Sequence, residues 1–163
     1  MIGEKMQAAL NKQVNAELYS SYLYLSMAAY LESENLSGMA HWMRVQAKEE
    51  QTHAMKFFDF VVERGGRVTL SAIDAPETQW GSALAAFTAA YEHERKVTQM
   101  IDDLVKLAGS EGDTASAVFL QWFVAEQVEE EKNADEIVQK LRMIKDSPHG
   151  LLMLDRALGE RSE

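Results

Sequence analysis

Apolar residues recur every three or four positions along most of the chain, the spacing that places side chains on one face of a helix. Five segments carry this pattern, four long and one short, at about residues 4–33, 38–64, 81–109, 114–143 and 148–159. The pattern therefore predicts an all-α protein with four long helices and a short C-terminal fifth.

Short polar or glycine-containing stretches separate these segments. The sequence Asn35-Leu-Ser-Gly38 interrupts the first pair, and Ser37 is the expected N-cap of the second helix. Gly65-Gly66 ends the second helix, and a turn near residue 111 separates the third from the fourth. Helices joined by such short turns run antiparallel, so we expect two antiparallel pairs.

The connection between the second and third helices is longer. Residues 67–80 lack helical periodicity and contain Pro76. About 14 extended residues reach roughly 46 Å, and a helix of about 28 residues is roughly 42 Å long. The linker can therefore cross the whole bundle and make the two middle helices parallel. We expect one domain, residues 1–163, with the ferritin-like arrangement of a four-helix bundle and one long crossover.

Each long helix interrupts its apolar stripe with side chains that can bind a metal: Glu17, Glu50 with His53, Glu94, and Gln127 with Glu130. Glu17 and His53 each lie 18 residues from the turn near residue 35. Glu94 and Gln127 lie 17 and 16 residues from the turn near residue 111. In antiparallel pairs, equal distance from the turn means equal height, so these groups meet at mid-bundle.

Four buried carboxylates would repel one another, and each costs several kcal/mol unless it is paired. Two divalent cations would neutralise their four charges. Glu50 and His53 lie one turn apart on one helix face, so both can reach a metal. The mixture of oxygen and imidazole ligands suits iron, manganese or zinc. One Glu-x-x-His is a weak signal, but the agreement of four helices predicts a two-metal carboxylate site.

Composition excludes several classes of protein. The chain has 26 acidic and 16 basic residues, a net charge of −10, which argues against a nucleic-acid partner. It has no cysteine, which excludes disulfides and thiolate metal centres. No apolar run approaches the roughly 18 residues of a membrane span, and the start lacks the pattern of a signal peptide. We expect a cytoplasmic protein with no membrane partner.

Other candidate residues have simpler interpretations. His41, His93 and His149 have no converging partners and are expected to be surface or core histidines. Tyr24 lies two turns after Glu17 on the same stripe, either as a packed aromatic or as a hydrogen-bond donor beside the metals.

Four motifs together resemble the non-haem ferritins of bacteria and archaea, over essentially the whole chain: NAELYSSYLYLSMA, EEQTHAM, YEHE and FLQWFVAEQVEEE. Ferritin-like sites often have a second Glu-x-x-His, whereas the fourth helix here has Gln127-x-x-Glu130. Gln51 follows Glu50, where bacterioferritins carry a haem-ligating methionine, so the resemblance implies no haem. Rubrerythrins need a cysteine-ligated iron domain that this chain cannot build.

The resemblance also implies the roles of the site residues. One iron would be held by Glu17, Glu50 and His53. The other would be held by Glu50, Glu94 and Glu130, with Glu50 bridging and Gln127 hydrogen-bonding nearby. A third, weaker iron position would use Glu49, Glu126, Glu129 and Glu130. Tyr24 would lie beside the centre, and Trp122 would be an aromatic close to it.

The implied function is iron storage with ferroxidase activity. Fe²⁺ would be oxidised by O₂ or H₂O₂ at two or three iron positions per subunit, and ferric mineral would be kept inside a shell of 24 subunits. Two alternatives remain open: a diiron oxidase or peroxide-scavenging enzyme that stores no mineral, and a structural or adaptor bundle whose carboxylates bind nothing.

Overall fold

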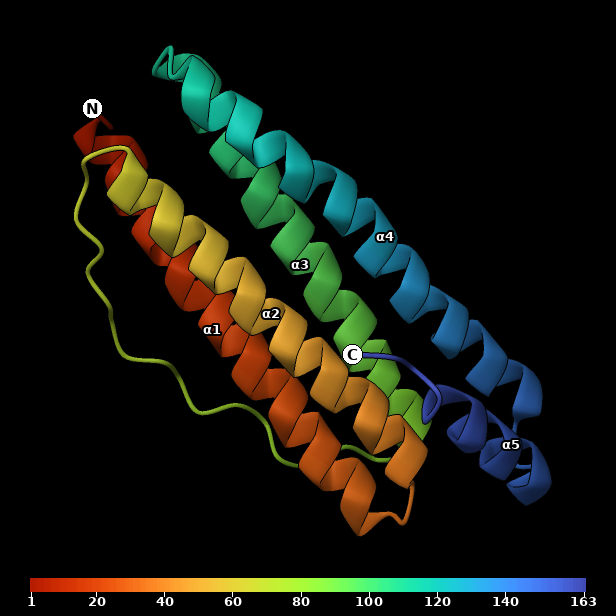
Figure 1. The fold of residues 1–163 in the computed structure, drawn as a ribbon. Helices are drawn as coiled ribbons and strands as arrows, with labels where there is room; N and C mark the ends of the chain where they lie inside the picture. The colour runs from red at the N-terminus through yellow and green to blue at the C-terminus, as the bar shows by residue number, and fades with distance from the viewer.

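The computed structural model describes all residues from 1 to 163 and contains five α-helices and no strands. The helices are α1 (Glu4–Ser33), α2 (Ser37–Glu63), α3 (Ala83–Ser110), α4 (Thr114–Ile144) and α5 (Pro148–Leu158). The predicted fold class is confirmed: four long helices form a bundle, and the short α5 lies at one end of it (Figure 1). None of the five helices combines the length and the hydropathy that a membrane-spanning helix needs.

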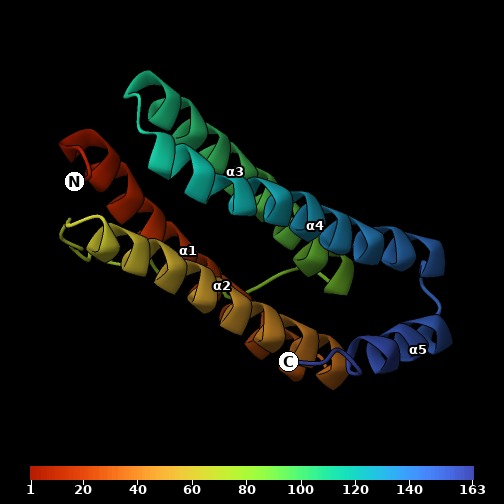
Figure 2. The same cartoon turned by 45° about the horizontal axis from the view of Figure 1, so that its top comes forward.

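The bundle consists of two antiparallel helix pairs, α1 with α2 and α3 with α4 (Figures 1 and 2). The segment from residue 64 to residue 82 runs along the outside of α1 for the length of the bundle (Figure 1). Because this linker returns the chain to the end at which α2 began, α2 and α3 run in the same direction. The predicted long crossover is therefore confirmed.

Side chains of α1 hold the linker in place through its backbone carbonyls. Asn11 Nδ2 donates to the carbonyl of Arg67 at 3.0 Å, and Asn15 Nδ2 donates to that of Ala72 at 3.1 Å. Farther along, Ser26 Oγ donates to the carbonyl of Glu77 at 2.6 Å. An extended segment outside a sheet must find partners for its backbone groups, and the outer face of α1 supplies them.

The apolar core is divided into two clusters. One contains Met39 and Phe87 and fills the end of the bundle nearest α5. The other contains Leu10, Phe57 and Phe123 and fills the opposite end. Full burial of each such large side chain contributes about 1.5–3 kcal/mol. The polar side chains of the four long helices lie at the height between the two clusters, so apolar packing on both sides fixes where they sit.

The start of α2 differs from expectation. Ser37 is the first residue of the helix, Leu36 is the N-cap, and no side chain of that turn caps it. Asp155 of α5 supplies the cap instead, because its Oδ1 accepts from the Met39 backbone nitrogen at 2.8 Å. The prediction of Ser37 as N-cap was wrong because a long-range contact satisfies the donor that a local serine usually serves.

Candidate metal centre

The four long helices present six buried polar side chains to one another at mid-height, each at most 4% exposed: Glu17, Glu50, His53, Glu94, Gln127 and Glu130. Within this group, ligand atoms of Glu17, Glu50 and His53 lie within 4.8 Å of one another. Ligand atoms of Glu50, Glu94 and Glu130 form a second set with the same spacing. Glu50 belongs to both sets, so the two candidate positions for a metal are adjacent.

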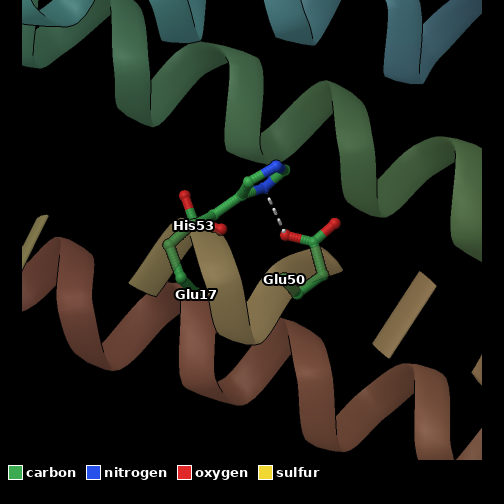
Figure 3. Close-up of side chains that lie close together, drawn as sticks. All are labelled: Glu17, Glu50 and His53. Carbon is green, nitrogen blue, oxygen red and sulfur yellow. Dashed lines mark hydrogen bonds and ion pairs between the residues drawn. The ribbon is translucent and has the colours of Figure 1, made fainter. Parts of the chain in front are cut away.

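The first set comes from α1 and α2. Figure 3 shows Glu17, Glu50 and His53 pointing toward one another, and His53 Nδ1 lies 3.2 Å from Glu50 Oε2. Glu17 Oε1 accepts from Gln13 Nε2 at 3.0 Å, whereas Glu17 Oε2 is buried without any partner. A buried, unpartnered carboxylate oxygen is costly in a folded protein. A cation between these three side chains would satisfy it, so the residues present fit a bound metal.

The second set is held by hydrogen bonds to Glu94. The Tyr24 hydroxyl donates to Glu94 Oε1, so this buried tyrosine is both a packed aromatic and a hydrogen-bond donor. Gln127 Nε2 donates to Glu94 Oε2 at 3.1 Å and to the Glu94 carbonyl at 3.2 Å. Gln127 therefore orients a carboxylate with its amide nitrogen.

Burial and mutual repulsion change the proton affinities of these acids. Burial, reinforced by the charge of Glu50, raises the pKa of Glu17 well above its usual value. The same two causes raise the pKa of Glu94 to about 8. Burial and the charges of Glu94 and Glu50 raise the pKa of Glu130 to about 9. Burial alone would raise the pKa of Glu50 as well. The hydrogen bond and charge of His53 outweigh burial, so the pKa of Glu50 is lowered.

In a metal-free centre at neutral pH, Glu94 and Glu130 therefore keep their protons, whereas Glu50 is the carboxyl whose ionised form is favoured. Burial lowers the pKa of His53, but its hydrogen bond with Glu50 outweighs burial and leaves that pKa raised. Cations entering the centre would compete with these protons for the same oxygens, which couples metal binding to proton release.

One aromatic and one basic side chain, those of Trp122 and Lys56, border the first set. The Trp122 ring lies edge-on to the His53 ring, with 5.5 Å between centroids. Lys56 Nζ lies over the same Trp122 ring, 3.2 Å from its centroid. The structure thus places Trp122 beside a candidate ligand, as the resemblance implied.

The four residues expected at a third position are only partly brought together. Glu126 and Glu130 form a set with His53 within 4.8 Å, and His53 Nε2 lies 3.8 Å from Glu126 Oε1. Glu129 is exposed, and Glu49 Oε2 instead accepts from Arg161 Nη2 at 3.0 Å. Neither Glu49 nor Glu129 belongs to a set of three ligand atoms.

The remaining histidines lie outside the ligand sets. His93 is partly buried, and its Nε2 lies 2.7 Å from Ser20 Oγ. His41 Nε2 lies 2.8 Å from the Arg161 carbonyl oxygen, and His149 is exposed near the start of α5.

Several residues that support the centre were missed in the sequence. Gln13 and Gln46 each lie four residues before a candidate ligand, and both are buried. Gln46 Nε2 donates to Glu50 Oε1 at 2.9 Å and to Glu130 Oε2 at 2.8 Å. The available signal was an uncharged amide one helical turn before a buried acid. Arg161, which contacts Gln46, lies in the C-terminal tail and gave no signal.

Comparison with known proteins agrees with this geometry. Residues 7–144 match the family described as the ferritin-like domain. The bacterial non-heme ferritin of Bacteroides fragilis is 46% identical over 161 residues, covering 99% of this chain and 100% of that protein. A probable bacterial non-heme ferritin-like protein of Haemophilus influenzae is 38% identical over 162 residues, covering 99% and 98% of the two chains.

Among solved structures, an open pore ferritin from the hyperthermophilic archaeon Archaeoglobus fulgidus superposes with a TM-score of 0.99 at 57% identity. The match covers 99% of this chain and 100% of that one. With the fold, the domain match and relatives of this similarity in agreement, the chain belongs to the ferritin family.

Proposed function

We propose that this protein oxidises Fe²⁺ to Fe³⁺ at the candidate metal centre and stores the ferric product as mineral inside a shell of many copies, 24 by the family resemblance. The observation that carries the proposal is the sharing of Glu50 between two buried ligand sets. One carboxylate common to both sets is what bridging two substrate irons requires.

The ligands suit this substrate. The first position offers Glu17, Glu50 and His53, and the second offers Glu50, Glu94 and Glu130. Four ionised carboxylates match the charge of two Fe²⁺ ions. Hard oxygen ligands bind Fe³⁺ more strongly than Fe²⁺ and so favour oxidation.

Electrons and protons balance in this reaction. Two Fe²⁺ ions lose two electrons, which reduce O₂ to H₂O₂ with two protons or H₂O₂ to two waters with two protons. The raised pKa values of Glu94 and Glu130 mean that these carboxyls release protons as the irons enter. We expect Tyr24 and Gln127 to keep Glu94 oriented as it loses its proton, because both donate to its carboxyl oxygens.

Storage requires assembly, and the surface supports it. Leu152 and Met153 of α5 are 60% and 62% exposed, and Met143 of α4 is 78% exposed. Clustered exposed apolar side chains mark surfaces that associate. The relatives from Bacteroides and Archaeoglobus carry the name ferritin, which supports a shell for this chain as well.

We place a third iron position at His53, Glu126 and Glu130, which Glu49 and Glu129 could join only after moving.

The proposal is tested by comparing Fe²⁺ oxidation in the native protein and in Glu50→Ala under air. We expect Glu50→Ala to lose the fast phase of ferric absorbance, because both positions lose a ligand. Glu63→Ala is the matched control, since Glu63 is an exposed glutamate of the same helix. Unchanged fast oxidation in Glu50→Ala would remove this centre as the site of reaction.

A further inference from the structure

The C-terminal tail after α5 returns along α2 (Figure 2). Its Arg161 side chain contacts Gln46 and Glu49 of that helix. Arg161 Nη1 donates to the Trp42 carbonyl at 3.2 Å, and its guanidinium carbon lies 4.3 Å from the centroid of the Trp42 ring. Its Nη2 donates to Gln46 Oε1 at 3.0 Å and to Glu49 Oε2 at 3.0 Å. The Arg161 side chain is 19% exposed, so several contacts fix a mostly buried guanidinium.

Gln46 connects this arginine to two candidate ligands. It is 1% exposed, and its amide nitrogen donates to Glu50 and Glu130 on two different helices. An amide has two N–H donors and one acceptor oxygen. Both donors are used on the carboxylates, and the oxygen accepts from Arg161.

This chain of hydrogen bonds has one direction only. A guanidinium donates and cannot accept, so Arg161 requires the oxygen of Gln46 to face it. A flipped amide would turn its oxygen toward two acids and its nitrogen toward a cation. Without Arg161, the Gln46 oxygen would be a buried acceptor with no partner, and the amide would lose the constraint on its orientation.

We propose that Arg161 is a positioning residue of the candidate iron centre, acting through Gln46 on Glu50 and Glu130. The proposal rests on the proposed function. Its effect is unequal, because Gln46 holds two of the three ligands of the second position and one of the three ligands of the first. The second position, formed by Glu50, Glu94 and Glu130, depends more strongly on the tail.

The same guanidinium also holds Glu49, one of the acids expected at the third position. Loss of Arg161 releases Glu49 from its ion pair at the same time as it loosens Glu130. Arg161 thus keeps Glu49 away from the candidate ligands, while it holds Glu130 in place through Gln46.

The test is a calorimetric titration of the metal-free protein with Zn²⁺, which is redox-inert. It measures the Zn²⁺ affinity of each position. Loss of a residue that orients metal ligands typically lowers metal affinity about 10- to 100-fold. We expect Arg161→Ala to weaken the second position by about 10-fold or more and the first position less. Arg161→Lys should recover part of the loss, because a lysine can donate to Gln46.

A double-mutant cycle separates action through Gln46 from a general effect of the tail. In a Gln46→Ala background, Arg161→Ala should cause no further loss of Zn²⁺ affinity at the second position. Lys48→Ala is the control, since it removes the 2.6 Å contact of the tail residue Glu163 with α2 and leaves Gln46 untouched. It should leave both affinities unchanged.

Two results would overturn the role of Arg161 while the proposed function stands: unchanged Zn²⁺ affinities in Arg161→Ala, or an equal loss in both backgrounds of the cycle. If Arg161→Ala lowers the melting temperature, Arg161→Lys carries the comparison. A native protein that binds neither Zn²⁺ nor Fe²⁺ at the centre would overturn the proposed function, and this proposal with it.

Discussion

Residues of one chemical type behave differently in this centre because their neighbours differ. Glu50 has His53 one turn away and is the carboxylate whose pKa falls. Glu94 and Glu130 have neutral donors and other acids as neighbours, and their pKa values rise to about 8 and about 9. In the metal-free bundle, Glu94 and Glu130 therefore bind protons at the oxygens that would bind iron in the proposed function.

The first prediction separates the two positions. We expect His53→Ala to weaken metal binding at the first position by about 10-fold or more and at the second position much less, because His53 belongs to the ligand set of the first position and not to that of the second. Two-site Zn²⁺ calorimetry measures both affinities, and His149→Ala, at an exposed histidine, is the control. An equal loss at both positions would contradict the division of ligands given above.

The raised pKa values also predict how stability changes with pH. Above pH 4.5, folded Glu94 keeps up to about pH 8, and folded Glu130 up to about pH 9, a proton that the unfolded chain releases. Their contribution to stability is complete below pH 4.5 and declines as pH rises, until it is lost above about 9. The metal-free protein should therefore melt at progressively lower temperature from pH 5 to pH 9.

The control for this prediction is the double variant Glu94→Gln with Glu130→Gln, which cannot ionise at these two positions. Its melting temperature should fall less over the same range, because the contributions of these two carboxyls are removed while those of Glu17, His53 and the net negative charge remain. If the melting temperatures of the native protein and the double variant fall equally from pH 5 to pH 9, Glu94 and Glu130 do not cause the loss of stability.

At the scale of elements, the short α5 is tied to the first turn of α2. A Cβ added to Gly38 would lie 1.8 Å from the Asp155 carbonyl oxygen, so only glycine allows the two backbones to approach this closely. The same contact brings Asp155 to cap α2, and α5 leads directly into the tail that carries Arg161. The position of α5 thus bears on the centre through the residues that follow it.

Gly38→Ala should destabilise the protein by about 1–3 kcal/mol, because the backbone of α5 must move to admit the methyl group. Gly109→Ala is the matched control: this glycine lies in α3, and an added Cβ has nothing within 4 Å. We expect that variant to be neutral or up to about 1 kcal/mol more stable. Urea denaturation of both variants makes the comparison, and equal stabilities would contradict the close packing of α5.

The sequence predicted the helices well because each one is amphipathic over many turns, and the linker length indicated the crossover. Counting residues from each turn also predicted the height at which Glu17 and Glu94 meet their partners. The capping of α2 by Asp155 and the contact of Arg161 with Gln46 were not predictable in this way. Both depend on where α5 and the tail fold back, and no local periodicity encodes that position.

At the scale of the whole molecule, two apolar clusters enclose a layer of acids. The clusters keep the bundle folded, and the layer between them is unfavourable without cations, as the unpartnered oxygen of Glu17 indicates. Metal binding at that layer should therefore stabilise the entire bundle through binding to the folded state alone. Storage adds a requirement that one bundle cannot meet, since mineral needs a cavity enclosed by many copies.

The most direct measurement is an aerobic Fe²⁺ titration of the metal-free protein that follows ferric absorbance and the iron kept soluble per chain. We expect uptake that continues far beyond the two or three ions that the ligand sets of one chain could hold. Saturation at two or three irons per chain, or precipitation of all further iron, would contradict storage and leave a diiron oxidase or peroxide-scavenging enzyme in its place.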